Sequence, residues 1–127
     1  MIFANDPLVT FVGEIGDADK DDFIGNSKAL LMPIDWPEPF GLVMIEAMAC
    51  GTPAIAYGHG SVPEIIDEGV TGFIVDNQEQ AIAAARDVGR IDRARCRDVF
   101  EKRFAARVMA RNYLDVYREL IEARIPA

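Results

Sequence analysis

Basic side chains are scarce in this sequence, and one long stretch has none. The 127 residues contain 13 Lys and Arg against 21 Asp and Glu, and no Lys or Arg occurs between Lys28 and Arg86. With a net charge of −8, we expect no non-specific binding to nucleic acid or to an anionic membrane surface. The negative net charge does not exclude a local anion site, because the backbone amides at a helix start bind an anion without carrying a formal charge.

Cysteine is rare in the sequence, and long apolar runs are absent from it. The two cysteines, Cys50 and Cys96, have neither metal-ligand spacing nor a CxxC pattern, so we expect free thiols in a reducing compartment. Met1 is followed by a short mixed segment and not by the basic and apolar regions of a signal peptide. No uncharged apolar run is long enough to span a bilayer. We therefore expect a cytoplasmic protein without a membrane span.

What is present is an alternation of apolar runs with helical patterns. The length suits one domain, and half of the residues are apolar. Short apolar runs predict strands at 9–13, 29–34, 53–57 and 72–75. Helical patterns begin near Asp17 and occupy 41–50, 62–69, 78–88, 92–103 and 105–123. This order predicts an α/β fold, a Rossmann-like parallel sheet with helices on both faces and further helices at the C-terminus.

Local signals mark several helix ends. Asp17, Asn77 and Asp92 are candidate N-caps, and Gly51 is expected to end the helix at 41–50. The acidic cluster after Asp17 could instead be considered as a metal site; it consists of Asp19, Asp21 and Asp22. Its spacing lacks the glycine and the distal glutamate of a calcium loop. We therefore interpret the cluster as a helix start, and we expect no metal.

The loops that follow the predicted strands should meet at one rim of the sheet. Ligands of parallel α/β sheets bind at the carboxyl ends of the strands, and the segments 34–41, 57–63 and 76–78 leave those ends. The helix start within the first segment offers the backbone amides of Phe40, Gly41, Leu42 and Val43. Such a start is suited to a phosphate or a sugar hydroxyl, and glycine lets a ligand approach the backbone closely.

Two carboxylates flank this helix start. Glu46 is the only formal charge from Pro39 to Pro63, and a charge in an apolar run must be paired, hydrogen-bonded or neutralised. It can accept hydrogen bonds from a ribose diol, or it can accept them from backbone amides or pair with an arginine. The apolar face expected to be buried on its helix consists of Leu42, Ile45, Met48 and Ala49.

Glu38 and His59 each allow two interpretations. Glu38 lies between Pro37 and Pro39, which hold it extended. It can point into the cleft and position a substrate, or it can be a favourable charge near a helix start, worth a few tenths to about 1 kcal/mol. His59, in the turn GHGS, is either an exposed turn residue or a contact to a phosphate or an acceptor.

The segments 36–56 and 60–75 resemble a known family. WPEPFGLVMIEAMACGTPAIA and GSVPEIIDEGVTGFIV are similar to the C-terminal half of retaining glycosyltransferases of the GT-B architecture, family 4. Glu38 and Glu46 match the family's E-x₇-E element, and Ala54 stands where valine is commoner. The turn GHGS departs from the frequent GG of the family.

The resemblance implies a nucleotide-sugar site without a metal or cofactor. Glu46 would accept hydrogen bonds from the ribose hydroxyls, and the amides of Phe40, Gly41 and Leu42 would meet the sugar and the diphosphate. Glu38, at the reaction centre, would position the transferred sugar and would not act as a nucleophile. The sugar of a nucleotide diphosphate donor would pass, with retention, to a saccharide or lipid-linked acceptor, while charge develops on the leaving phosphate near the helix end.

The resemblance also implies missing parts. Residues 1–127 would be a C-terminal nucleotide-sugar-binding domain without the N-terminal domain, without its own first strands, and without the Arg and Lys that contact the diphosphate. We therefore expect this chain alone to be inert. A non-catalytic Rossmann-like nucleotide-binding or structural module is the alternative, and a sugar epimerase is disfavoured because epimerases lack this arrangement of motifs.

The missing strands have a structural consequence. In the strand order 3-2-1-4-5-6, the strands at 29–34, 53–57 and 72–75 would be contiguous, and the strand at 9–13 would lose its neighbour. Open apolar edges recruit strands, so we expect either the transfer of 9–13 to the free edge or a homo-oligomer formed through it. The apolar stripe of the last helix should be partly exposed.

Overall fold

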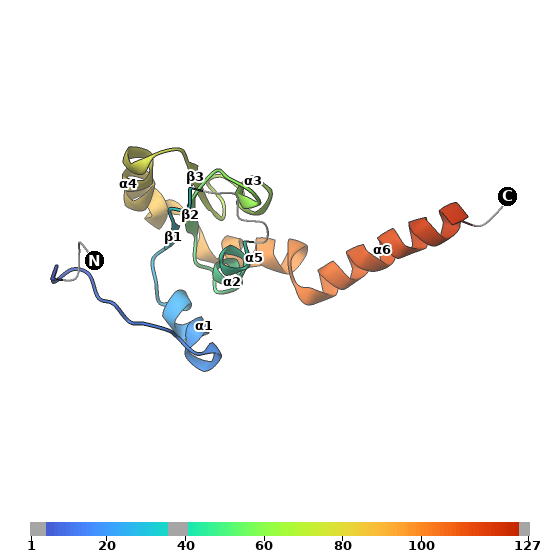
Figure 1. The fold of residues 1–127 in the computed structure, drawn as a ribbon, viewed down its shortest axis with the longest axis horizontal. Helices are drawn as coiled ribbons and strands as arrows, with labels where there is room; N and C mark the ends of the chain where they lie inside the picture. The colour runs from blue at the N-terminus through green and yellow to red at the C-terminus, as the bar shows by residue number, and fades with distance from the viewer. Residues whose placement is uncertain (1–4, 36–40, 125–127) are drawn as a thin grey trace.

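A three-stranded parallel sheet organises the molecule. The computed structural model describes residues 5–35 and 41–124, and there the sheet has the order β1-β2-β3 (Figure 1). The strands are β1 (Leu30–Met32), β2 (Ala54–Tyr57) and β3 (Gly72–Val75). The prediction of three contiguous parallel strands is confirmed. The first is shorter than predicted; Pro33, which follows it, has no N–H to continue the ladder.

Residues 9–13 form no strand. Phe11 is 80% exposed, and the backbone N–H of Val9 donates to the C=O of Asp6. A strand exists only where a neighbour completes its hydrogen bonds, and no such neighbour lies among the described residues. The predicted strand, and its predicted transfer to the free edge of β1, are therefore both wrong.

The helices follow the predicted order. They are α1 (Asp17–Gly25), α2 (Leu42–Ala49), α3 (Val62–Ile65), α4 (Gln78–Asp87), the 3₁₀ turn η1 (Val88–Arg90), α5 (Arg93–Arg103) and α6 (Ala106–Arg124). The side chain of Asn77 accepts from the N–H of Gln80, and Asp92 caps α5, both as predicted. Asp17 does not cap α1, because the N-cap position is Gly16. Gly51 ends α2 in the left-handed conformation, with φ +72°.

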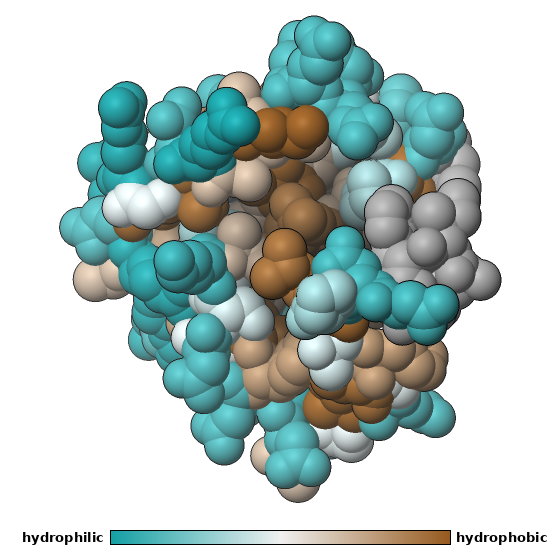
Figure 2. All heavy atoms as spheres, turned by 90° about the vertical axis from the view of Figure 1, so that its left-hand side faces the viewer, coloured by the Kyte–Doolittle hydropathy of each residue, from teal (hydrophilic) through white to brown (hydrophobic). Residues whose placement is uncertain are grey.

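Helices cover both faces of the sheet, as predicted. The larger core lies between the sheet and α2 with α5, and it contains Met44, Met48 and Cys96. A smaller core joins Ile55 and Val75 to α4 on the other face. A cavity of about 450 Å³ lies beside this second face, lined by Leu31, Ile55, Val75, Gln78 and others. Figure 2 shows apolar side chains gathered in a hollow on the side of the molecule where α4 lies.

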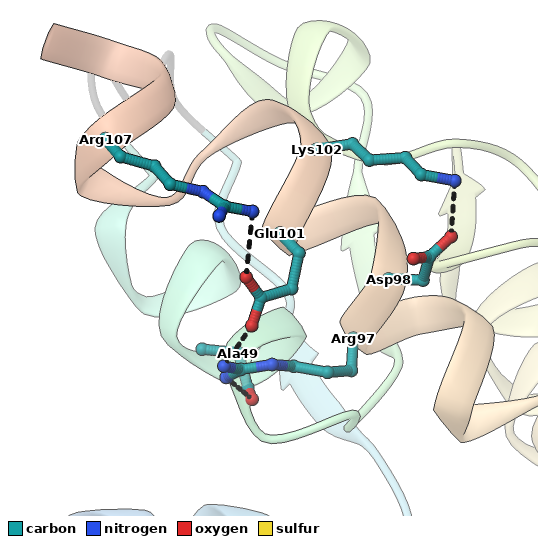
Figure 3. Close-up of polar contacts among 6 residues, drawn as sticks. All are labelled: Ala49, Arg97, Asp98, Glu101, Lys102 and Arg107. Carbon is teal, nitrogen blue, oxygen red and sulfur yellow. Dashed lines mark hydrogen bonds and ion pairs between the residues drawn. The ribbon is translucent and has the colours of Figure 1, made fainter.

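Polar contacts connect α5 to its neighbours (Figure 3). Arg97 donates to the C=O of Ala49 at the end of α2, and it also pairs with Glu101. Glu101 in turn lies 3.7 Å from a guanidinium nitrogen of Arg107 in α6. These contacts connect the start of α6, through α5, to the end of α2.

Beyond its first turn, α6 projects away from the sheet (Figure 1). None of its residues is buried, and all of its large apolar side chains except the half-buried Val108 are exposed: Met109, Tyr113, Leu114, Val116, Tyr117, Leu120 and Ile121. The expected exposure of this stripe is confirmed. No helix in the described part of the chain has the length and apolar character needed to cross a membrane.

Candidate functional site

The turns after β1 and β2 meet at one rim of the sheet. Asp35 follows β1 and His59 follows β2, and Nε2 of His59 lies 3.1 Å from Oδ1 of Asp35. The predicted convergence of these two loops is thus confirmed. His59 is a half-exposed turn residue with an acidic partner, which agrees with the first of its two interpretations; the alternative, a contact with a phosphate or an acceptor, is not tested by this geometry.

Gly41 shapes the start of α2 at this rim. Its φ of +62° is left-handed, and a Cβ there would lie 2.5 Å from Cδ1 of Ile65 and from Cε of Met44. The left-handed backbone conformation therefore favours glycine at this position, whereas the two nearby atoms are the ends of flexible side chains that can shift. The expected close approach of a ligand to the backbone of Gly41 stays a prediction.

The exposed face of α2 carries Leu42 and Glu46. Leu42 is 64% exposed, whereas Met44, Ala47 and Met48 are buried. The prediction that Leu42 belongs to the buried face is therefore wrong, whereas Met48 is buried as predicted. The core side of α2 consists of Met44, Ala47 and Met48. Leu42 and Glu46 are four residues apart, and residues at this spacing share one helix face. The start of α2 thus presents a carboxylate and an apolar side chain outward.

Glu46 is paired with a cation that the sequence did not identify. Its Oε2 is buried, and Nζ of Lys20 in α1 lies 3.0 Å from it; the contact is an ion pair without regular hydrogen-bond geometry. This contact with Glu46 raises the pKa of Lys20 above its usual value. The pairing with a cation was anticipated, but the partner is a lysine and not an arginine.

Ser61 is a second residue that the sequence analysis missed. Its hydroxyl is buried and has no hydrogen-bond partner among residues 5–35 and 41–124, and it lies 3.0 Å from where a Cβ of Gly41 would be. A buried hydroxyl normally finds a partner. In the sequence, the only signal for such a site is the serine in the turn GHGS, since a hydroxyl beside a glycine-rich turn can donate a hydrogen bond to an anion.

The remaining predicted site residues cannot be placed. Glu38 and Phe40 lie outside the described residues, so their predicted roles at the reaction centre and the donor stay predictions. No cluster of His, Cys, Asp or Glu that could hold a metal occurs in 5–35 or 41–124. Cys96 is fully buried, and this burial raises the pKa of its thiol to about 11, so Cys96 serves packing and not nucleophilic chemistry.

Comparisons with known proteins agree on the family of this fold. The family model "Glycosyl transferases group 1" matches residues 5–95. A D-inositol 3-phosphate glycosyltransferase of Streptomyces griseus is 40% identical over 83 residues, covering 65% of this chain and 17% of that protein.

Two solved structures share the fold. The sucrose-phosphate synthase of Thermosynechococcus elongatus has a TM-score of 0.72 at 33% identity, over 91% of this chain and 31% of that one. HepE of Anabaena, in a complex with UDP-glucose, has a TM-score of 0.73 at 23% identity, over 90% of this chain and 33% of that one. Both matches identify the fold as part of a GT-B architecture. The chain spans a third or less of the length of each of these three proteins.

Proposed function

Because this chain belongs to the glycosyl transferases group 1 family, we propose that it is the donor-binding part of a retaining glycosyltransferase. The complete enzyme would transfer a sugar from a nucleotide diphosphate sugar to a hydroxyl of a saccharide or lipid-linked acceptor. The observation that carries the proposal is the outward face of α2, where Glu46 follows a glycine-started helix at the carboxyl rim of a parallel sheet.

In this proposal each part of α2 has its own ligand group. The N-terminal end of the helix, at Gly41 and Leu42, attracts the diphosphate, because helix dipoles favour negative charge at that end. The glycine N-cap supplies no side-chain oxygen of its own to the first amides of the helix. Glu46 then accepts hydrogen bonds from the ribose diol. Glu38 and Phe40 serve the transferred sugar, and the chemistry needs no metal.

Binding of nucleoside diphosphates tests the proposal. We expect UDP, GDP or ADP to bind this chain in calorimetry, and Glu46→Gln to weaken that binding about tenfold, because charged hydrogen bonds to hydroxyls become neutral ones. Glu119→Gln, the same change on the exposed face of α6, should leave the affinity unchanged. Absence of binding by all three nucleotides would reject the donor-binding role, and binding that ignores Glu46 would favour a nucleotide-binding module of another kind.

We also expect that this chain alone does not catalyse transfer. The stretch from 29 to 85 contains no Lys or Arg, and within the described residues Lys20, the only cation paired at the site, is engaged with Glu46. The leaving diphosphate therefore has little cationic stabilisation. Incubation with UDP-glucose or GDP-mannose, with or without a sugar acceptor, should release no nucleotide above background. Turnover by the pure chain would contradict this expectation.

A further inference from the structure

The contact between α1 and α2 assigns a role to a residue outside the helix that carries the site. Nζ of Lys20 lies 3.0 Å from Oε2 of Glu46, although the two residues are 26 positions apart in the chain. We propose that Lys20 is a positioning residue, which holds the Glu46 carboxylate in the orientation that accepts the ribose hydroxyls of the nucleotide. This inference rests on the proposed donor-binding function.

The two oxygens of the carboxylate are not equivalent. Oε2 is buried against Lys20, while the Glu46 side chain as a whole is 41% exposed, so its exposed surface belongs to its other atoms. An ammonium group 3.0 Å from one oxygen attracts that oxygen and so restricts the rotation of the carboxylate. The second oxygen is then left as the acceptor for a vicinal diol.

Lys20 stands on a helix that is anchored and not loosely attached. The hydroxyl of Thr52 donates to the C=O of Ile24 at 2.8 Å, and Arg93 donates to the C=O groups of Gly25 and Ser27 at 2.7 Å each. Ile24 is buried and lies one turn beyond Lys20, on the same helix face. The face of α1 that carries Lys20 is therefore fixed toward the body of the domain, where α2 lies.

Two other roles for Lys20 predict different results. If the ion pair only joins α1 to α2, its loss would lower the affinity for all ligands equally or for none of them. If Lys20 masks Glu46 in the free protein, its removal would strengthen nucleotide binding. Only a positioning role predicts a loss of affinity that is confined to ligands with ribose hydroxyls.

The test compares UDP, GDP and ADP with their 2′,3′-dideoxy analogues, by calorimetry on the full chain. We expect the tightest of the three ribonucleotides to exceed its dideoxy analogue about tenfold in affinity, as for hydrogen bonds to a charged group. Lys20→Met should bring this ratio close to one, with little change for the dideoxy form. Lys20→Arg should retain most of the ratio. Lys28→Met, which removes an exposed lysine of the same charge, should leave it unchanged.

A double-mutant cycle tests whether Lys20 acts through Glu46. The double variant Lys20→Met with Glu46→Gln should lose no more affinity for the ribonucleotide than Glu46→Gln alone, because the effects of substitutions within one network are not additive. Each variant is first compared with the unchanged chain by circular dichroism, and Lys20→Gln replaces Lys20→Met if that variant does not fold.

The outcomes separate the inference from the proposed function. The positioning role is overturned if Glu46→Gln lowers the affinity ratio but Lys20→Met or Lys20→Gln leaves it unchanged. It is also overturned if either Lys20 variant binds the ribonucleotide more tightly. If Glu46→Gln leaves the ratio unchanged, the role of Glu46 itself fails, and the inference fails with it. Absence of binding by all three ribonucleotides overturns both.

Discussion

At the scale of single residues, Arg93 holds the end of α1 in place. Its guanidinium donates to the C=O groups of Gly25 and Ser27 and to the hydroxyl of Thr52, which is fully buried. Removal of the guanidinium would leave these partly buried acceptors without a donor, and such groups retain the full cost of lost hydration. Arg93 therefore links α5 to the segment between α1 and β1 and to the residues that lead into β2.

We expect Arg93→Met to lower the free energy of unfolding by about 3 kcal/mol, since several hydrogen bonds to a charged group are lost together. Urea unfolding followed by circular dichroism measures the change. Arg95→Met, at an exposed position of the same helix, should change stability by less than about 0.5 kcal/mol. Equal effects of the two substitutions would show that the network does not stabilise the fold.

The sequence could single out Glu46 but not its surroundings. One charge in an apolar run is visible in the letters alone, and so is the glycine before it. The partner Lys20 was not predictable, because a contact between residues 26 positions apart depends on how α1 docks. The same holds for the Ser61 hydroxyl, whose burial follows from the packing of α3 against Gly41.

At the scale of elements, β2 and β3 approach each other at a glycine. Gly72 pairs with Ala54, and a Cβ on Gly72 would lie 2.0 Å from the C=O oxygen of Ala54. Backbone atoms cannot yield as a flexible side chain can. The register of the two strands therefore depends on the absence of a side chain at this position.

Gly72→Ala should lower the free energy of unfolding by about 3 kcal/mol, because overpacking must displace one strand. Thermal and urea unfolding both report this change. Gly89→Ala is the matched control, since within the described part of the chain no atom outside its immediate neighbours lies within 4 Å of its Cβ position, and it should be neutral or slightly stabilising. A stable Gly72→Ala variant would mean that the two strands pack less closely than described.

Elements with local signals were predictable, and those that depend on partners were not. Asn77 and Asp92 carry their capping chemistry in their own side chains, and both cap as predicted. The strand at 9–13 failed because β-branched and aromatic composition cannot supply a neighbouring strand. Leu42 was assigned to the wrong face because the helix pattern alone does not say which of two apolar faces meets the sheet.

At the scale of the whole molecule, two apolar surfaces lack cover within the described residues. One is the outer edge of β1, where Leu31 is 60% exposed beside the cavity. The other is the apolar stripe of α6. The solved relatives extend well beyond the matched region, since the chain spans 31% and 33% of their lengths.

We predict that the isolated chain associates with itself through the free edge of β1, because unpaired strand edges recruit other strands. Sedimentation at increasing concentration should show species above the monomer mass. Leu31→Lys, a charge of the kind that protects natural edge strands, should shift the distribution toward the monomer, whereas Leu120→Lys in α6 should not. A chain that stays monomeric at all concentrations would contradict the prediction.

The central claim is that the outward face of α2 binds the nucleotide part of a sugar donor. Its most direct test is a titration of the ¹⁵N-labelled chain with UDP, GDP and ADP, followed by two-dimensional NMR. We expect the largest shift changes at the amides of Gly41, Leu42 and Glu46, with smaller changes at Lys20. Saturable changes elsewhere, with these amides unmoved, or no change with any of the three nucleotides would contradict the claim.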